Sequence, residues 1–519
     1  MAYRLGIDVG GTNTDAVVLN DELEVIASTK SATTEDVMSG IENAMKAVLE
    51  QIGDERARIG YAMLGTTQAT NAIVERKHLN KVGIIRIGLP ATEAIEPMCG
   101  WSEDLKAAIG GQSYLVHGGH EFDGREISKL DEDEIRTALS KMKGQVSTVA
   151  IISVFSPVND SHELKAQELV KEVLGEEVPV SLSSEIGSIG LIERENSTIL
   201  NAALYDVAKK TVLGFKEALN HQNISAKIYL GQNDGTLMNA DYAVKYPVLT
   251  IACGPTNSIR GAAYLAGFED ALVVDVGGTT TDVGVLQRGF PRQSSLAVEI
   301  GGVRTNFRMP DLISLGLGGG TIVRGVDNAG EISVGPDSVG YKLTQEARIF
   351  GGNTLTTSDV VVALGHADLG DASYLKDLES SKLEEVYQKM IEMTEDVIDR
   401  MKTSAQPVPV ILVGGGSLLL PQTLTGASEV AKPEHFEVAN AIGSAIAQVS
   451  GEVEKLYSLE DMSRAEAVED AKALAISDAI EAGAEPDSIE IVDIEDVPLA
   501  YLPGNVTRVH VKAAGNLRM

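Results

Sequence analysis

The chain has 519 residues, of which 44% are hydrophobic and 4% aromatic, and its formal net charge is −32. This length exceeds what one hydrophobic core supports, so two or more domains are expected. The negative charge argues against nucleic acid or an anionic membrane as a partner, so any anionic ligand must be held by local groups.

Residues 1–190 are predicted to alternate strands and helices. Hydrophobic patterning predicts strands at 3–9, 14–19, 23–29, 59–64, 81–87, 147–154 and 178–182, and helices at 34–52, 67–76, 131–143 and 160–174. The stretch at about 88–128 is rich in glycine and irregular, and its length predicts an insertion with its own role.

Residues 191–451 are expected to form a second half. The pattern predicts one long helix at 190–220, a strand at 226–230, helices at 255–267, 377–403 and 437–450, and a very apolar strand at 408–413. Residues 452–519 are predicted to form a small α+β appendage, with a helix at 463–482 and strands near 488–494 and 505–512.

One octapeptide occurs twice with a single difference. Residues 8–15 are Asp-Val-Gly-Gly-Thr-Asn-Thr-Asp, and residues 275–282 are Asp-Val-Gly-Gly-Thr-Thr-Thr-Asp. Each copy lies between apolar runs, which is typical of two strands joined by a tight glycine turn. Such glycines let the backbone approach a phosphate, whose oxygens can then face threonine hydroxyls and backbone N–H groups. Two copies far apart predict two homologous half-domains that close on one nucleotide.

The repeat supplies most of the candidate site. The expected phosphate contacts are Gly10, Gly11, Thr12, Asn13, Thr14, Gly277, Gly278, Thr279, Thr280 and Thr281. Asp8 and Asp275 are expected to orient Mg²⁺ through water. For Asp15 and Asp282, a catalytic role and local stabilisation of the turn both remain open.

A third glycine element follows the apolar strand at 408–413. There, Gly414, Gly415, Gly416 and Ser417 would let an adenine ring lie on the backbone, and Gly318 and Gly319 are further candidate contacts. The order hairpin, hairpin, strand–glycine resembles the actin, sugar-kinase and heat-shock-chaperone ATPase superfamily. That resemblance implies an α/β fold in which two ribonuclease-H-like domains hold ATP in a cleft.

Four further segments narrow the resemblance. Residues 65–77 are GTTQATNAIVERK, 118–126 are GGHEFDGRE, 252–262 are ACGPTNSIRGA and 315–321 are LGLGGGT. With the first hairpin, they resemble the hydantoinase/oxoprolinase family, specifically its ATP-binding A subunit, over about residues 3–450. The chain departs from the family in the segments Tyr341–Arg348 and Gln232–Gly235. It is also shorter than typical members, and the region after Gly451 does not resemble their C-terminal domain. These departures leave the identity of the substrate open.

The family resemblance implies an ATP- and Mg²⁺-dependent hydrolase. Phosphorylation of the carbonyl oxygen of a hydantoin, lactam or 5-oxoproline-like ring makes the ring carbon electrophilic, and water then opens the ring. A B-type subunit or a homo-oligomer is the implied partner, and relatives serve as ketone-carboxylase subunits. The candidate substrate contacts are Thr67, Asn71, His120, Asp123 and Asp234.

Two other functions remain open from the residues. In a small-molecule kinase, Asp234 would act as the base toward a substrate hydroxyl, and phosphate would end on a stable product. In an ATPase switch, closure of the cleft would control binding to another protein, without turnover of a small molecule.

The remaining candidate residues are expected to have structural rather than catalytic roles. His117, His120, Glu121 and Asp123 are metal-ligand types at close spacing, but a polar loop facing the substrate cleft is favoured over a metal site. Trp101 and Tyr114 are expected to anchor the insertion. Cys253 is expected to be a small buried group, and with only Cys99 besides it no disulfide framework is possible. With no signal peptide and no run of about 18 apolar residues, a cytoplasmic location is expected.

Overall fold

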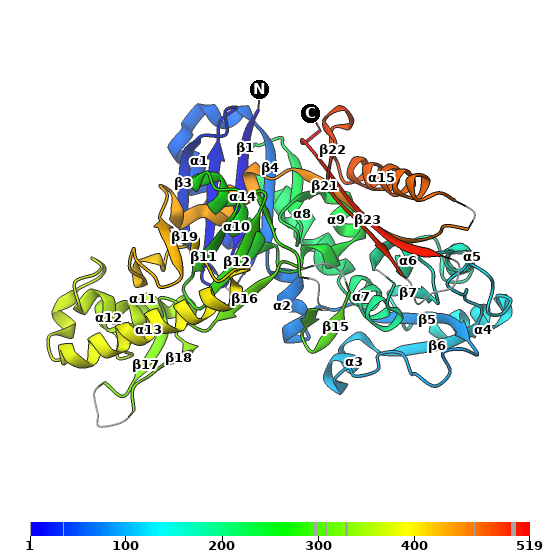
Figure 1. Cartoon of the computed structure of the whole chain (residues 1–519), viewed down its shortest axis with the longest axis horizontal. Coiled ribbons are helices and arrows are strands. Elements are labelled where there is room, and N and C mark those ends of the chain that lie inside the picture. The colour runs from blue at the N-terminus through cyan, green and yellow to red at the C-terminus, as the bar shows by residue number, and fades with distance from the viewer. Residues whose placement is uncertain are drawn as a thin grey trace.

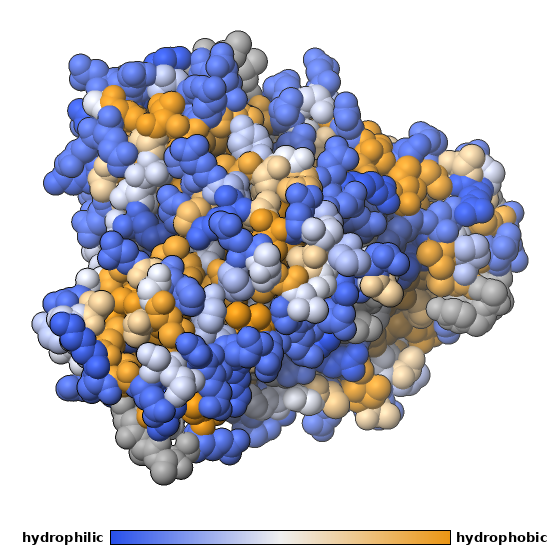
Figure 2. Space-filling view, turned by 60° about the vertical axis from the view of Figure 1, so that its left-hand side comes forward, coloured by the Kyte–Doolittle hydropathy of each residue, from blue (hydrophilic) through white to orange (hydrophobic). Residues whose placement is uncertain are grey.

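The structure, a computed structural model, describes residues 2–34, 36–187, 189–294, 298–306, 309–326, 331–460, 462–499 and 505–518. Helices pack on the nine-stranded and six-stranded sheets, which are mixed, and on a four-stranded parallel sheet, which gives the α/β architecture of Figure 1. The face seen in Figure 2 is largely hydrophilic with scattered apolar residues, as the charged composition predicts.

The first half is built around the first copy of the repeat. Strands β1 (Tyr3–Val9), β2 (Asn13–Leu19) and β3 (Val25–Ala32) are antiparallel neighbours, and β4 (Ile59–Thr66) and β9 (Lys227–Gly231) extend the sheet parallel to β1. The order β3-β2-β1-β4-β9 is that of a ribonuclease-H-like domain. Helix α1 (Val37–Ile52) packs its apolar face on this sheet.

The second copy of the repeat builds the same arrangement. Strands β11 (Ala271–Val276) and β12 (Thr281–Gln287) form its hairpin, and β13 (Phe290–Pro291) and β16 (Leu312–Leu315) pair antiparallel with β12. Strands β19 (Val408–Val413) and β20 (Ala427–Ala431) continue the sheet parallel to β11. The two halves therefore share one strand order, which confirms the predicted fold class.

A separate four-stranded sheet accounts for much of residues 80–187. Its order is β6 (Gln112–His117), β5 (Val82–Leu89), β7 (Thr148–Ser153) and β8 (Val180–Leu182), all parallel. The neighbouring helices are α3 (Glu103–Ile109), α4 (Glu132–Met142) and α5 (Ser161–Leu174). The stretch 88–128 thus contains regular elements that patterning did not predict. Strand β6 is an edge strand with mostly half-buried residues, so its sequence carries little alternation.

The C-terminal strands continue the sheet of the first half. Strands β21 (Val449–Ser458), β23 (Val506–Gly515) and β22 (Glu490–Pro498) join β9 through β10 (Leu237–Asn239), which completes a nine-stranded sheet. Helix α15 (Arg464–Glu481) packs an alanine stripe against these strands. The domain limits at 190 and 451 stay a prediction. In this sheet, β4 is hydrogen-bonded to β9 across the first limit, and β21, which spans the second limit, is hydrogen-bonded to β10 before it and to β23 after it.

Two predicted helices differ in extent from the observed ones. The helix expected at 190–220 is two helices, α7 (Leu191–Ala203) and α8 (Tyr205–His221). The side-chain oxygen of Asn80 accepts the backbone N–H of Asp206 at 2.9 Å, and the backbone N–H of Asn80 donates to the Ala203 carbonyl at 2.8 Å. Asn80 therefore occupies the break. The helix expected at 437–450 is α14 (Ala439–Ile446), which ends before β21 begins.

The other helices fall close to their predicted positions. They are α2 (Gln68–Glu75), α10 (Cys253–Ala266) and α13 (Ser380–Met401). The helix expected from residue 34 begins at Val37, and Glu35 lies outside the described residues. The remaining described α-helices and strands are α6 (Ser183–Ile186), α9 (Ala240–Lys245), α11 (Leu343–Glu346), α12 (Thr357–Ala363), β14 (Val298–Ile300), β15 (Val303–Thr305), β17 (Thr321–Arg324) and β18 (Ser333–Ser338).

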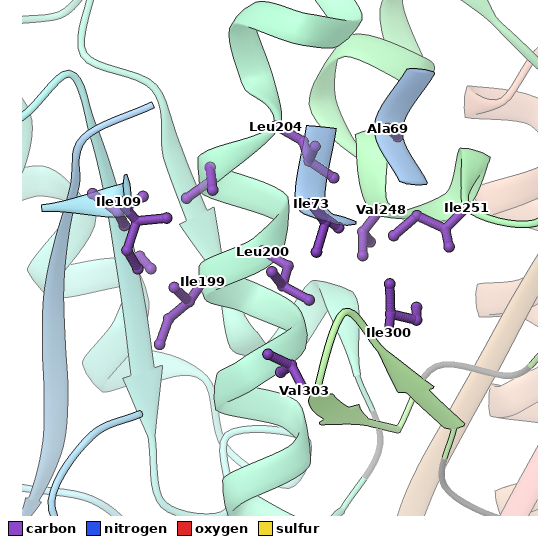
Figure 3. Close-up of a cluster of buried hydrophobic side chains, with 14 of the residues drawn as sticks. Ala69, Ile73, Ile109, Ile199, Leu200, Leu204, Val248, Ile251, Ile300 and Val303 are labelled. Carbon is purple, nitrogen blue, oxygen red and sulfur yellow. The ribbon is translucent and has the colours of Figure 1, made fainter. Parts of the chain in front are cut away.

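A large apolar cluster holds the four-stranded sheet to the first half. Figure 3 shows Leu200 of α7 between Ile73 of α2 and Val303 of the β14–β15 hairpin, and Ile199 of α7 on the side of Ile109. Burial of these side chains supplies the main attraction between the two parts. Among the described residues, no helix has both the length and the apolarity to cross a membrane.

Candidate functional site

The two hairpin tips face each other across the boundary between the halves. The hydroxyl oxygens of Thr12 and Thr279, one from each tip, are 3.4 Å apart. Within each tip, the glycine N–H donates to the carbonyl three residues later: Gly10 to Asn13 at 2.9 Å and Gly277 to Thr280 at 2.8 Å. The two copies of the repeat therefore fold alike and meet at one place.

Each hairpin carries two aspartates in directly opposed positions. Asp8 pairs with Asp15 in the register of β1 and β2, and Asp275 pairs with Asp282 in that of β11 and β12. A paired position on antiparallel strands points both side chains to the same face. Each tip thus carries two carboxylates, both from its own half.

The first aspartate of each hairpin lies against a glycine at the end of the adjacent parallel strand. A Cβ atom at Gly65 would lie 2.2 Å from Oδ1 of Asp8, and one at Gly414 would lie 2.2 Å from Oδ1 of Asp275. No larger residue fits beside either carboxylate. Since the two glycines lie against corresponding aspartates, the similarity of the two halves extends beyond the repeated octapeptide to the end of the adjacent strand. Gly414 was predicted from the sequence, and Gly65 lies in the segment 65–77.

Asp8 is buried and held by two asparagine side chains. It is 3% exposed, and the side-chain amides of Asn257 in α10 and Asn440 in α14 donate to its two oxygens at 3.1 and 3.0 Å. Burial raises the pKa of Asp8 to about 6, although the Asn257 hydrogen bond lowers it and the charges of Asp15 and Asp275 raise it further. A cation at the tips would favour the ionised form.

The other three carboxylates each have a specific partner. Lys30 of β3 donates to both oxygens of Asp15 at 2.7 Å, and burial raises the pKa of Asp15 despite this charge. Ser314 of β16 donates to Asp282, whose pKa burial raises to about 6. Burial also raises the pKa of Asp275, while a hydrogen bond from Ser258 and the charge of Lys30 oppose the rise.

The predicted glycine segments pack against the second tip. The N–H groups of Gly319 and Gly320 donate to the carbonyls of Gly277 and Gly278 at 3.1 and 2.7 Å, and Gly416 donates to Val276 at 2.7 Å. A Cβ at Gly318 would lie 2.6 Å from the nitrogen of Thr279. Of the other predicted residues here, Gly415 is exposed and Ser417 is buried.

The donor set at the tips fits a polyphosphate. The N–H groups of Gly11, Thr12, Gly278 and Thr279 donate no hydrogen bond within the described residues. Thr14 and Thr281 are buried in the strands, whereas Gly11, Thr279 and Thr280 are exposed. Exposed backbone donors in front of buried carboxylates can bind phosphate oxygens together with a hydrated cation. In the described residues, no three of the four aspartates bring ligand atoms within 4.8 Å of one another.

The candidate substrate residues fall into two groups. Thr67 and Asn71 lie at the edge of the sheet that carries Asp8. The Thr67 hydroxyl is 3.5 Å from the Val9 carbonyl oxygen, and the side-chain amide of Asn71 donates to the Thr67 hydroxyl at 3.4 Å. Asp234 follows β9 at the same edge, where it pairs with Lys512 at 2.7 Å and lines a cavity of about 460 Å³.

The candidate ligands of the 117–123 loop are not brought together. Glu134 binds His117 at 2.9 Å and Arg125 binds Asp123 at 2.7 Å. The rings of His120 and His162 are tilted by 37°, with 4.2 Å between their centroids. Burial lowers the pKa of His120. Glu121 forms a turn with Arg125 through its backbone.

The remaining candidate groups are enclosed or anchored. Cys253 is buried, its Sγ donates to the Thr66 carbonyl at 3.4 Å, and burial raises the pKa of the thiol to about 12. The Trp101 indole N–H donates to Asn196 at 2.7 Å. The half-buried Tyr114 ring lies beneath Lys141, whose nitrogen is 5.6 Å from the ring centroid.

Sequence reasoning missed several groups that hold the aspartates in place. These are Lys30, Asn257, Ser258, Ser314 and Asn440. Asn257 and Ser258 lie in the segment 252–262, whose pattern could have indicated them. Lys30, Ser314 and Asn440 carry no local signal, because each acquires its role only through a contact distant in sequence.

Two family models match most of the chain. The hydantoinase/oxoprolinase N-terminal region matches residues 4–174, and hydantoinase/oxoprolinase matches residues 194–413. Caprolactamase subunit alpha of Pseudomonas jessenii is 28% identical over 72% of this chain and 56% of its own length. The acetophenone carboxylase gamma subunit of Aromatoleum aromaticum is 28% identical over 70% of this chain and 53% of its own. The aligned region thus spans about half the length of these curated relatives.

Two solved structures share the fold. The ATP-dependent caprolactamase of Pseudomonas jessenii superposes with a TM-score of 0.78 at 21% identity, covering 99% of this chain and 88% of that one. The nucleotide-free acetone carboxylase superposes with a TM-score of 0.68 at 18% identity, with the same shares of the two chains covered. These likenesses extend the shared architecture through the C-terminal strands.

Proposed function

The chain belongs to the hydantoinase/oxoprolinase family, and we propose that it is the ATP-binding subunit of an enzyme that activates a cyclic amide for hydrolysis. The observation that carries this proposal is the pair of facing hairpins, each with two aspartates and free backbone donors. The caprolactamase relatives support a lactam-like ring as the substrate class.

The proposed chemistry begins with the amide oxygen. Magnesium ATP, when bound, supplies the phosphoryl group that this oxygen accepts. The phosphorylated carbonyl carbon is electrophilic, so one water adds to it and the C–N bond breaks as the ring nitrogen takes up a proton. A second water then hydrolyses the resulting acyl phosphate to a carboxylate and free phosphate. The activation step has little covalent work for the protein, which positions the reactants and stabilises charge.

The residues at the tips would divide these tasks. Backbone N–H groups of Gly11, Thr12, Gly278 and Thr279 would hold phosphate oxygens. Asp8 and Asp275 would bind Mg²⁺ through water, and Asn257 and Asn440 would fix the carboxylate of Asp8 for that purpose. Gly318 and Gly414–Gly416 would let the nucleotide approach the backbone beside the second tip.

The matching test is phosphate release from ATP in the presence of ε-caprolactam, hydantoin or 5-oxoproline. We expect one ring to stimulate release, and we expect Asp8→Asn and Asp275→Asn to lower the stimulated rate at least about 100-fold, a typical effect of removing a preorganised charged group. Asp54→Asn, which removes an exposed carboxylate from the surface, is the control and should not change the rate. Unchanged release in both site variants would refute the proposed roles.

The carboxylase relatives favour a second candidate, activation of a ketone for carboxylation. The acetophenone carboxylase subunit is as similar to this chain as the caprolactamase subunit is. In this case a ketone stimulates phosphate release only when bicarbonate is present, and no ring is opened. A kinase would instead leave the phosphate on the product, so ADP would accumulate without free phosphate.

A second subunit is part of the proposal. The similar caprolactamase and carboxylase chains are themselves named as subunits. We therefore expect the reaction to need a B-type partner chain. The phosphate-release assay is accordingly run with and without the protein that co-purifies from the native source, and ring opening is measured by the product amine or carboxylate.

A further inference from the structure

Three potential metal ligands gather on the strands farthest from β3 in the nine-stranded sheet. Glu495 of β22 lies directly opposite His510 of β23, and Asp493 is two residues before Glu495, which places it on the same face. One ligand atom from each of these three residues lies within 4.8 Å of the others. Four strands separate β23 from β1, so the cluster is distinct from the hairpin site.

The imidazole of His510 is held in a form that suits a metal. It is 1% exposed, and its Nε2 lies 2.8 Å from Oε1 of Glu452 on β21. A hydrogen on Nε2 satisfies this contact and leaves the lone pair of Nδ1 available. A carboxylate that accepts the second N–H of a histidine is the usual outer partner of a metal-bound imidazole.

The Nδ1 atom of His510 has no hydrogen-bond partner in the described residues, although it is buried. Oδ2 of Asp493 lies 3.8 Å from this nitrogen, which exceeds hydrogen-bond length. A buried polar atom without a partner costs about 1–3 kcal/mol, so its position between two carboxylates needs a reason. A bound cation would give this nitrogen a partner and would also contact both carboxylates.

From this geometry we propose that Asp493, Glu495 and His510 bind a divalent transition-metal ion, Zn²⁺ or Mn²⁺. One imidazole with two carboxylates suits these ions better than Mg²⁺ or Ca²⁺, which prefer all-oxygen sites. Ligands bound at about 2.0–2.2 Å lie no more than about 4.3 Å apart, so the three groups need to close by only about half an ångström. Glu495 is exposed and Asp493 half-buried, so the ion enters from solvent and water completes its coordination.

Charge on the neighbouring strand supports the same conclusion. Glu454 of β21 lies opposite His510 on the side away from Glu495, and Glu452 is two residues before it. Acidic side chains therefore flank the histidine on both sides, which raises the local concentration of cations. Two cations of β23, Arg508 and Lys512, are each two residues from His510, and Lys512 is engaged by Asp234 at 2.7 Å.

The test measures metal binding by the full chain without nucleotide. Protein stripped with EDTA is titrated calorimetrically with ZnCl₂ and MnCl₂ in an Asp8→Asn background, so that ions at the hairpins do not contribute. We expect one equivalent to bind, and we expect His510→Ala to abolish this binding. Asp493→Asn and Glu495→Gln change surface groups and should weaken it at least 10-fold, whereas Glu490→Gln, an exposed carboxylate on the same strand, should leave it unchanged.

A spectroscopic readout separates a metal site from a charged pair. Co²⁺ should give visible absorption bands in the parent protein that His510→Ala loses, and Zn²⁺ should raise the melting temperature of the parent but not of Asp493→Asn. If His510 is instead an imidazolium held between Glu452 and Asp493, the stripped protein binds no ion and shows neither effect. Either that result or equal binding by the Glu490→Gln and Asp493→Asn variants would overturn the proposal.

Discussion

At the scale of single residues, the hairpin site concentrates negative charge where water is scarce. Asp8, Asp15, Asp275 and Asp282 all have raised pKa values, and burial is the largest cause in each case. Lys30 is the cation that moderates Asp15 and Asp275. Such an arrangement destabilises the empty protein but favours a bound cation, which is the pattern expected of a site built for a metal–phosphate ligand.

The raised pKa of Asp8 predicts a pH dependence of stability. Its pKa is about 6 in the folded protein and 3.8 for the free group, so between these values the folded chain holds a proton that the unfolded chain has lost. Stability therefore falls as pH rises from 4 to 6. We expect Asp8→Asn to be more stable than the parent at pH 8, by at most about 3 kcal/mol, and to lose this gain at pH 4.

Chemical denaturation without Mg²⁺ or nucleotide measures this effect. Asp54→Asn is the control and should match the parent at both pH values. A variant at Asp8 that is destabilised equally at pH 8 and pH 4 would contradict the assignment, because it would mean that the carboxylate contributes through its hydrogen bonds alone.

At the scale of elements, two small-residue helices hold the halves together. A Cβ at Gly261 of α10 would lie 1.8 Å from the carbonyl oxygen of Ala439, and one at Gly443 of α14 would lie 1.8 Å from that of Asn257. The helix backbones are therefore in direct contact. This contact places Asn257 and Asn440, one from each helix, on the same carboxylate of Asp8.

Adding a methyl group at this contact should disturb both stability and the site. We expect Gly261→Ala and Gly443→Ala to lower the free energy of unfolding by about 1–3 kcal/mol or more, because neither backbone can move without its sheet. Both should also weaken binding of magnesium ATP, because the asparagines shift. Gly254→Ala on α10 meets no atom within 4 Å and is the matched control. If the Gly443→Ala protein folds and binds nucleotide as tightly as the parent, the contact between the two helices does not position the nucleotide site.

At the scale of the whole molecule, the C-terminal strands belong to the sheet that begins at the N-terminus. Strand β21 connects through β10 to β9, and β23 and β22 extend the sheet from there. One apolar cluster contains Met63 and Tyr229 of the first half together with Ala471 of α15 and Val509 and Val511 of β23. The end of the chain is therefore part of the core of the first half.

This shared core predicts the effect of truncation. A chain that ends after Ser458 lacks α15, β22 and β23, so β21 loses its partner and the cluster around Tyr229 is exposed. We expect such a chain to lose cooperative unfolding and to bind hydrophobic dyes, as loosely packed states do. Thermal melting and dye fluorescence, compared with the full chain, check this. A sharp melting transition in the truncated chain would show that residues 459–518 form an independent appendage.

The sequence by itself determined the two hairpins, their aspartates and glycines, and the fold class, because these depend on a local pattern that occurs twice. It also placed most helices within a few residues. It did not predict strand β6, whose half-buried edge carries little periodicity, or the break at Leu204, which Asn80 makes from a distant part of the chain.

Only the tertiary structure decided which groups surround the aspartates and where the C-terminal strands pair. Lys30, Asn257 and Asn440 act through contacts with Asp15 and Asp8, and the last of these joins residues 432 positions apart. Periodicity reports which face of an element is buried but not what buries it. For that reason the sequence predicted the two glycine turns, whereas the residues that contact their aspartates and the cluster at His510 could be identified only from the tertiary structure.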